Sequence, residues 1–553
     1  MTMGPRWKRA DWLAAGGVAL AAMLLHARAL WHGFVNWDDN RFITDNPLFL
    51  AGGWTYVRAA LTRVQFDAYH PLHLLSYLPD RWWWPRSPMG FHALNLALFG
   101  ADVLLLFRLA RRHAGLVGAA AAALLFAAHP FTVEPVEWIS ARKDLLAVAL
   151  FVGALLVEDA RDPETARPSL AGLLVFVLAL FAKSSTLCLP PILWCWLVWM
   201  RGASPRRALG RALPYAIVAL VEATAVVVIW RSHQMIPDRP ITAFIDVPAT
   251  VATYVRRIVW PSDLAAMYPA SMPAPLVAAA ACAVALAIAA LRWRRLPRAG
   301  RFALLGFLFA IAPVSNLVPV AFRFADRYAF LPLAVLVPPA AVGLDALWHL
   351  GRRQRIAAGA GLALAGTALL LGTVALGASW RDSDALWRHT TSVQPAAFLA
   401  RLKYGETLRD RHAWSAAAAQ YREAVRLRPD SALGYVGLFF LYATRAEVEG
   451  KWAPGTAAGW LRELGAAIDD SRRFDRLTQR FPRGLCSECA DMLLLLDLRR
   501  WPRSDSSLLD GARLALDGGI PDAALVLLSQ AQDPSAPAWQ ELAARARAAA
   551  GMK

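Results

Sequence analysis

The sequence predicts an all-α fold: a polytopic membrane bundle of helices followed by a C-terminal helical domain. Hydrophobic residues make up 57% of the chain, charged residues only 18%, and the mean hydropathy is +0.37. Apolar runs of about 15 to 22 residues recur from Asp11 to Ser379, and a helix needs about 20 residues to cross a hydrocarbon core. The composition becomes polar after Ser379. We therefore assign residues 1–379 to a multi-span membrane domain and residues 380–553 to a separate helical domain.

About 11 spans fit the apolar pattern. They are residues 11–31, 88–107, 114–128, 143–157, 168–183, 186–200, 212–230, 274–291, 302–319, 328–348 and 356–378. We interpret the first run as a membrane anchor, because no small-residue cleavage site of a signal peptide follows it.

Basic residues are concentrated in alternate connections between these spans. They are Arg6, Lys8, Arg9, Arg108, Arg111, Arg112, Arg201, Arg206, Arg207, Arg211, Arg292, Arg294, Arg295, Arg298, Arg301, Arg352, Arg353 and Arg355. The positive-inside rule places these connections in the cytoplasm, so the N-terminus is inside and an odd number of spans puts the C-terminal domain outside. The net charge of +18 is thus explained by membrane orientation and does not indicate a nucleic-acid partner.

The first outside segment, residues 32–87, is long and aromatic, which is typical of a partly helical layer at the membrane interface. It contains the run Trp37-Asp38-Asp39. Adjacent carboxylates at this surface indicate an acid–base site, in which Asp38 and Asp39 are the candidate catalytic residues. The alternative is structural, because Asp and Asn before a proline also form ordinary turns and helix caps.

Four cations lie at outside span ends, where Lys and Arg are normally under-represented: Arg142, Lys143, Lys183 and Arg327. Their convergence predicts a site for an anionic lipid phosphate, bound by charge-assisted hydrogen bonds. The alternative is snorkelling of each side chain to ordinary head groups. Other outside polar residues are candidates to line the site or to orient the cations: His70, Asp80, His92, Asn95, His129, Glu134, Asp144, Asp326 and Tyr328.

The remaining polar and thiol residues give weaker signals. Asp102, Glu222 and Asn316 fall within predicted spans, where structural hydrogen bonding is expected. Cys486 and Cys489 form a CxxC without a second pair, which favours a disulfide over a zinc site. No metal ligand set is predicted.

The C-terminal domain carries one clear repeat. Small and large residues at Gly405, Leu408, Ala417, Tyr421, Ala424 and Pro429 follow the 34-residue tetratricopeptide spacing. A looser match runs through residues 514–538, with Gly519 and Ala524 at the small positions. This pattern predicts a short α-solenoid of the TPR type, whose usual role is to present a groove to a partner.

Seven ordered segments carry a resemblance to a known family: FVNWDDNRFITDNP, YHPLHLLSYLPD, GFHALN, AAHPFTVEPVEWISARKDLLA, AKSSTLCLPPIL, RRIVWPSDLAAMYP and FADRYAFLP. In this order they resemble bacterial relatives of the transmembrane and tetratricopeptide-repeat (TMTC) O-mannosyltransferases, within glycosyltransferase superfamily C (GT-C). The resemblance covers residues 30 to 430. It departs from the eukaryotic pattern at Ser184, where those proteins often carry an acidic residue, and in its shorter repeat array.

The resemblance implies a GT-C-type glycosyltransferase of the bacterial inner membrane. Such an enzyme moves a sugar from a polyprenyl-phosphate donor to a hydroxyl of a protein or glycan on the non-cytoplasmic side, with inversion. Asp38 or Asp39 then matches the base, and Arg142, Lys143 or Arg327 stabilises the leaving phosphate. Glu134 and Asp144 orient those cations, and His70 contacts donor or acceptor. No cofactor is implied, a divalent metal stays open, and the sugar and acceptor are not specified.

Two other function classes stay open on the sequence. A flippase or exporter of polyprenyl-linked glycans should line a full transmembrane path with charged or broken spans, whereas the ionisable groups here gather on one side. A non-catalytic scaffold that recruits partners through its TPR-like repeats leaves the shared face of carboxylates and cations unexplained.

Overall fold

The computed structural model describes residues 7–429 except 66–68, 233–242, 270–275 and 318–321, together with single residues between 431 and 528 and the stretch 537–549. All regular structure in this described part is helical, which confirms the predicted class. The chain divides into two compact units, Met1–Pro395 and Ala396–Lys553.

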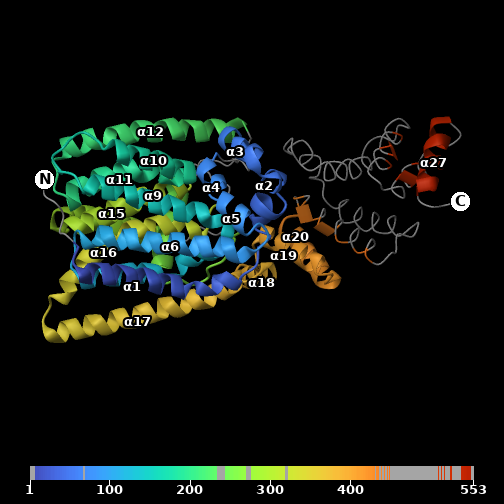
Figure 1. The fold of residues 1–553 in the computed structure, drawn as a ribbon. Helices are drawn as coiled ribbons and strands as arrows, with labels where there is room; N and C mark the ends of the chain where they lie inside the picture. The colour runs from blue at the N-terminus through green and yellow to red at the C-terminus, as the bar shows by residue number, and fades with distance from the viewer. Residues whose placement is uncertain are drawn as a thin grey trace. The chain divides into compact units, whose positions relative to one another are not determined.

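The first unit contains most of the helices (Figure 1). Its α-helices are α1 (Arg9–Leu25), α2 (Pro47–Ala51), α3 (Gly53–Thr62), α4 (Pro71–Leu75), α5 (Leu78–Trp83), α6 (Pro88–Arg111), α7 (Leu116–Ala127), α8 (Val133–Glu137), α9 (Arg142–Asp159), α10 (Leu170–Ala182), α11 (Leu189–Cys195), α12 (Pro205–Ser232), α13 (Ala243–Val259), α14 (Leu276–Leu291), α15 (Arg298–Ile311), α16 (Phe330–Trp348), α17 (Arg352–Gly377) and α18 (Ser383–Val393). Short 3₁₀ or π turns connect them: η1 (Ala27–Trp31), η2 (Asn40–Thr44), η3 (Pro130–Thr132), η4 (Ile139–Ala141), η5 (Ser184–Cys188), η6 (Trp196–Met200), η7 (Trp293–Arg295), η8 (Ala312–Val314), η9 (Asp326–Ala329) and η10 (Ala378–Trp380).

The long helices run side by side, with α16 packed against α7, α15 and α6 (Figure 1). The α7 sequence is rich in alanine, and Ala119, Ala122 and Ala123 are buried. Small side chains let helix backbones approach closely, which is how helices associate where no hydrophobic effect operates between them. The alanine-rich sequence therefore sets the tight packing of α7 on its neighbours.

Four described helices are long and apolar enough to cross a membrane: Pro88–Arg111, Pro205–Arg231, Asp326–Trp348 and Arg352–Trp380. A fifth span results if Leu116–Ala127 and the bent segment Pro130–Glu137 are counted together. These apolar helices indicate a membrane protein, and the count of 11 spans stays a prediction. One predicted span, 302–319, is shorter than expected, because α15 ends at Ile311 just before Pro313.

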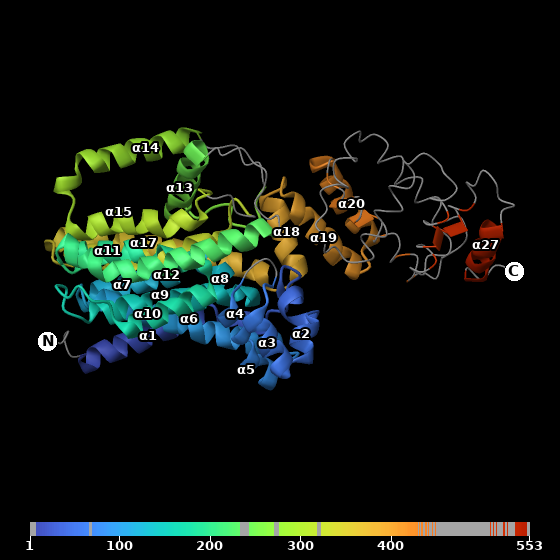
Figure 2. The ribbon, with the colours of Figure 1, turned by 90° about the horizontal axis from the view of Figure 1, so that it is seen from above.

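Helices α2 to α5 form a layer at one end of the bundle, at the end of α1 opposite to Arg9 (Figures 1 and 2). Proline begins α2 and α4, where its missing N–H costs nothing, and Asn46 caps α2 through bonds to the N–H groups of Leu48 and Phe49. A cluster of buried rings, including Phe49, Tyr56 and Tyr77, fills the layer. The predicted aromatic outside segment is therefore a packed helical layer.

Helix α18 belongs to the first unit, although the sequence boundary at residue 380 assigned it to the C-terminal domain. Trp387 packs edge-on against Trp37, and Gln394 donates to the carbonyl of Asp263. Because α18 is amphipathic and polar on its outer face, composition alone does not group it with the first unit.

The second unit contains α19 (Phe398–Asp410), α20 (Trp414–Leu427) and α27 (Pro537–Ala549). Helices α19 and α20 form a packed pair in which Ala417, Tyr421 and Ala424 are buried, and the assignment of this pair to a TPR-type repeat stays a prediction. Cys486, Cys489 and Gly519 lie outside the described residues, so the disulfide and the second repeat stay predictions.

Candidate active site

Asp39 is a buried carboxylate that joins the first outside segment to the start of α9. It is 1% exposed and accepts hydrogen bonds from the backbone N–H of Val35 (2.9 Å), from the backbone N–H of Ser140 (3.1 Å) and from Ser140 Oγ (2.5 Å). Burial raises the pKa of Asp39 to about 6, against the lowering effect of these bonds. Both oxygens are used internally, so Asp39 fixes the loop that carries Asp38.

Asp38 is the more accessible member of the pair, with its side chain 24% exposed. Its Oδ1 lies 3.6 Å from Arg41 Nη1, in an ion pair between two partly exposed groups. The negative charge of Asp38 also acts on the Lys143 ammonium. The Asp38 carboxylate thus keeps a face that an incoming hydroxyl can reach, which a general base requires.

Lys143, the second residue of α9, is the unusual cation of this region. Its side chain is half-buried, and its Nζ lies 5.6 Å from the centre of the Phe42 ring. This ammonium donates no hydrogen bond to any described residue and forms no ion pair with one. Three surrounding charges besides Asp38 act on it, namely Asp144, Lys183 and Arg327. A desolvated ammonium without a partner is costly, so this position favours an anionic ligand.

The other two cations are already paired with carboxylates. Lys183, which follows α10, donates to Asp144 Oδ1, and its Nζ lies 5.7 Å from the Tyr328 ring centre. The second oxygen of Asp144 has no partner among the described residues. The pair therefore orients Lys183 while leaving acceptor capacity on Asp144.

Arg327 is held by Glu134 from α8. Its Nη1 donates to Glu134 Oε1 at 2.5 Å, and its backbone N–H donates to Oε2 at 2.7 Å. The guanidinium carbon lies 5.2 Å from the Trp138 ring centre and 5.3 Å from that of Tyr328. Tyr328 thus lies beside both Arg327 and Lys183, which brings the two cations to one ring.

His70 adds a neutral group to the same region. Its Nε2 accepts from the backbone N–H of Ser184 at 3.3 Å and lies 3.2 Å from Ser184 Oγ. Burial lowers the pKa of His70 to about 3, and the positive charges of Lys143 and Lys183 act in the same direction. The imidazole is therefore uncharged at neutral pH. Ser184 Oγ also donates to Glu222 of α12 (3.0 Å), so Glu222 borders this region.

Arg142 has a different role from the phosphate contact that its position in the sequence predicts. It is fully buried, and all five N–H donors are used: Nε to Asn95 (2.7 Å), Nη1 to Ser76 O (2.8 Å) and to Asp80, and Nη2 to Asp80 (3.1 Å) and to Phe91 O (3.0 Å). No donor remains for a ligand. Arg142, Asp80 and Asn95 therefore brace α9, α5 and α6 against one another beside Lys143.

Two other predicted site residues, His129 and Asp326, lie in the supporting frame. His129 Nδ1 accepts a hydrogen bond from the backbone N–H of Phe131 (3.2 Å), and its Nε2 lies 3.0 Å from the carbonyl oxygen of Ile258. These contacts connect the end of α7 to α13. Asp326 accepts from Tyr268 Oη (2.6 Å) and from the N–H of Ala265 (3.0 Å). Neither side chain shares a contact with Lys143.

His92 is buried in α6, and neither ring nitrogen has a hydrogen-bond partner among the described residues. Its ring centre lies 6.0 Å from that of His32. His32 also lies 3.6 Å from Glu137, so His92 lies beside the contacts of Glu137 and apart from Lys143, Lys183 and Arg327.

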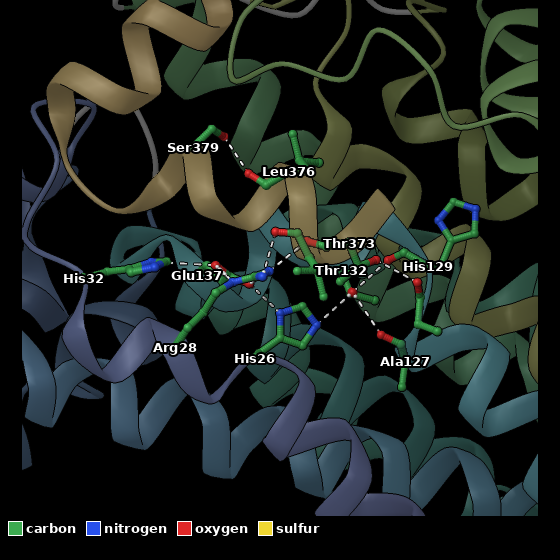
Figure 3. Close-up of polar contacts among 12 residues, drawn as sticks. His26, Arg28, His32, Ala127, His129, Thr132, Glu137, Thr373, Leu376 and Ser379 are labelled. Carbon is green, nitrogen blue, oxygen red and sulfur yellow. Dashed lines mark hydrogen bonds and ion pairs between the residues drawn. The ribbon is translucent and has the colours of Figure 1, made fainter. Parts of the chain in front are cut away.

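Sequence reasoning missed a further buried carboxylate, Glu137 (Figure 3). His26 Nδ1 lies 2.8 Å from Glu137 Oε1, and Arg28 Nη2 donates to the same oxygen at 2.9 Å. Arg28 also donates to the carbonyls of Thr373 and Val374 at 2.7 Å each, which attaches α17 to the network. The available signal was the repeated Glu of the VEPVE segment: Glu134 faces the site cation, and Glu137, three residues later, faces α1 and α17.

The α8–η4 segment thus connects most of the candidate site. Within a few residues it supplies Glu134 to Arg327, Glu137 to Arg28, Trp138 to a stack with Trp37 at 6.0 Å, and the Ser140 donors to Asp39. The resulting site combines a reachable carboxylate, Asp38, with three cations, of which only Lys143 lacks a partner among the described residues. This arrangement can accept a proton and neutralise one anionic group.

Two curated proteins are among those similar to part of the chain, both named protein O-mannosyl-transferase TMTC1. The Mus musculus protein is 33% identical over 169 residues, which cover 27% of this chain and 17% of the relative. The Homo sapiens protein is 32% identical over 171 residues, which cover 28% of this chain and 19% of the relative. The chain therefore spans less than a fifth of the length of the curated relatives it matches. No family model and no solved structure matches the chain.

Proposed function

We propose that this protein is an integral-membrane glycosyltransferase of the GT-C type that transfers a sugar from a polyprenyl-phosphate donor to an acceptor hydroxyl outside the cytoplasm. The observation that carries the proposal is the Lys143 ammonium, which has no hydrogen-bond or ion-pair partner among the described residues and lies within the electrostatic reach of the accessible Asp38 carboxylate. The partial similarity to proteins named O-mannosyl-transferases supports the same class of reaction.

In the proposed reaction Asp38 is the general base. It removes the proton of the acceptor hydroxyl, whose oxygen attacks the anomeric carbon of the donor sugar. The bond between that carbon and the phosphate oxygen breaks, and polyprenyl phosphate leaves with the electron pair. Attack opposite to the leaving group inverts the anomeric configuration. Asp39 holds the Asp38 loop through its bonds to Val35 and Ser140.

The phosphate charge is proposed to lie on Lys143, with Lys183 and Arg327 beside it. Asp144 and Glu134 form ion pairs with the latter two, so Lys143 is the cation of the three that forms no ion pair with a described carboxylate. A sugar–phosphate diester carries one negative charge, which Lys143 can pair with directly. The leaving phosphate gains a second charge as its bond to the sugar breaks, and nearby fixed cations stabilise it at that moment.

The proposed topology follows from the same arrangement. Helix α1 runs along the bundle from the end with the basic residue Arg9 to the end with α2–α5 (Figure 1). If Arg9 is cytoplasmic, the layer and Asp38 lie outside, in the periplasm of a bacterial inner membrane. We propose that the TPR-like unit is also outside and presents a protein or glycan acceptor.

The test is donor turnover by the purified protein in lipid nanodiscs. Labelled polyprenyl-phosphate mannose is the first donor to supply, because of the similar proteins' names, together with acceptor proteins and glycans from the host membrane. We expect release of polyprenyl phosphate by the wild type and almost none by Asp38→Asn, with equal donor binding in both. Equal release by the two proteins, or no donor binding by the folded wild type, would overturn the proposal.

A further inference from the structure

A cavity of about 730 Å³ lies in the α2–α5 layer, apart from the Asp38 and Lys143 region. It is lined by Phe49 and Leu50 of α2 and by residues of α5 and the segment that follows it, namely Arg81, Trp83, Trp84, Pro85, Arg86 and Ser87. None of these residues belongs to the candidate active site. Its lining combines large apolar rings with two guanidinium groups, which is the chemistry of an amphiphilic ligand.

Close packing fixes two walls of this cavity. Arg81 donates to the carbonyls of Phe49 (2.7 Å) and Leu50 (2.9 Å) at the end of α2. Gly52, with φ of +64°, leaves room for that guanidinium, since a Cβ there would lie 2.0 Å from the Arg81 carbon Cζ. At Gly90 of α6 a Cβ would lie 2.5 Å from the Trp84 indole. The absence of a side chain at the two glycines therefore lets Arg81 and Trp84 pack closely against the backbone, where they form two walls of the cavity.

Arg86 supplies the unpaired charge of the cavity. It is exposed and makes no hydrogen bond or ion pair with any described residue. Arg58 and Arg63 of the same layer are also exposed, whereas Asp80 is fully buried in its pair with Arg142. The described surface between residues 52 and 87 is therefore basic and carries no exposed carboxylate.

The same surface is strongly aromatic. Trp82 and Trp83 are each 67% exposed, and Trp54 is 73% exposed. Immediately after Ser87, α6 begins at Pro88, the first residue of an apolar helix long enough to cross a membrane. Tryptophan and arginine side chains concentrate where a span enters the head-group region, because each has an apolar part and a polar end. This position points to membrane lipid.

We propose that the cavity binds an anionic phospholipid of the bilayer, with its phosphate on Arg86 and the upper part of an acyl chain along Trp83, Trp84 and Leu50. The lining of the cavity contains two arginines and no carboxylate, so its charge is complementary to an anionic head group and not to a cationic one. A basic residue close to an anionic leaflet contributes about 1 kcal/mol, which is roughly a fivefold change in affinity.

Lipid bound in this cavity would be connected to the proposed active site through a short series of contacts. This consequence rests on the glycosyltransferase function proposed above. Arg81 follows Asp80 in α5, Asp80 binds Arg142, and Arg142 precedes Lys143. Bound lipid would hold α5 in place and so hold the base of the Lys143 side chain. We expect anionic lipid to stimulate transfer in the wild type.

Lipid retention tests the site independently of any activity. The full-length protein is placed in nanodiscs of phosphatidylcholine with a minor fraction of phosphatidylglycerol, and the lipid retained after release is measured by native mass spectrometry. We expect Arg86→Gln to retain at least about fivefold less phosphatidylglycerol than the wild type, and Trp83→Ala to retain less phosphatidylglycerol as well, because it removes the apolar wall. Arg58→Gln is the matched control, since it removes an equal charge from the same layer outside the cavity lining.

Two results would overturn the proposal. One is equal retention of phosphatidylglycerol by Arg86→Gln and Arg58→Gln in proteins with unchanged thermal unfolding. The other comes from adding polyprenyl phosphate to the nanodiscs: if Arg86→Gln loses polyprenyl phosphate and keeps phosphatidylglycerol, the cavity serves the donor. If retention behaves as expected while no transfer is found, the lipid site stands and the glycosyltransferase proposal fails.

Discussion

Replacing Lys143 by Gln is the sharpest perturbation of the proposed phosphate site. The substitution keeps most of the side-chain length and removes the one cation among Lys143, Lys183 and Arg327 that forms no ion pair with a described carboxylate. Because the ammonium has no internal partner among the described residues, its loss leaves no buried acid unpaired. The folded protein should therefore tolerate the change, and the effect should fall on the ligand.

The size of the effect follows from the interaction that is lost. A hydrogen bond to a charged group contributes about 1.5 to 3 kcal/mol, which corresponds to roughly 10- to 150-fold in donor affinity. The assay is binding of polyprenyl-phosphate mannose to protein in nanodiscs, measured by the donor concentration that half-saturates each variant. Transfer at saturating donor should fall as well, because the leaving phosphate loses a stabilising charge.

A paired variant controls for general loss of charge. The double change Lys183→Gln with Asp144→Asn removes one cation and its carboxylate together, so the net charge near Lys143 stays the same. It should weaken donor binding less than Lys143→Gln does. Donor affinity of Lys143→Gln equal to that of the wild type, in folded protein, would refute the assignment of the phosphate to Lys143.

Four further predictions follow from the site. Asp38→Asn should reduce the transfer rate by about 10²- to 10⁴-fold in a single-turnover assay while donor affinity is kept, because it removes proton acceptance. Asp39→Asn should abolish a pH-dependent part of the free energy of unfolding, which denaturant unfolding at several pH values measures. Because burial raises the Asp39 pKa to about 6, the native state binds the proton more tightly than the unfolded state does. The wild type should therefore lose up to about 3 kcal/mol of stability as the pH rises from about 4 to 6, and the variant should not. Arg142→Lys should lower the thermal midpoint, since an ammonium with three donors cannot make the five hydrogen bonds of the guanidinium and each buried acceptor left without a donor costs about 1 to 3 kcal/mol. Truncation after Pro395 should leave a first unit that still binds donor.

Each of these expectations has an outcome that contradicts it. Near-normal transfer by Asp38→Asn would remove the base, and an unchanged pH dependence of stability in Asp39→Asn would mean that another group titrates. An Arg142→Lys protein with normal stability but weak donor binding would restore Arg142 to the phosphate site. Loss of donor binding in a folded first unit would place part of the donor site in the C-terminal unit.

Pattern alone predicted the helical class, the apolar helices and the convergence of distant motifs. Hydropathy needs only composition along the chain, and the charged residues at the span ends predicted to lie outside are visible as violations of a statistical rule. That is why Lys143, Lys183, Arg327 and Asp38 could be proposed together before their positions were known.

The roles within that set required coordinates, because neighbouring residues in a helix point in different directions. Arg142 and Lys143 are adjacent and have the same charge, yet one is saturated by five internal acceptors and the other has no described partner. Asp38 and Asp39 divide in the same way, into a reachable carboxylate and a buried one that accepts three bonds. In both pairs the buried residue fixes the position of its neighbour. The proposed chemistry therefore depends as much on Arg142 and Asp39, whose polar atoms are used inside the protein, as on Lys143 and Asp38, for which substrate contact is proposed.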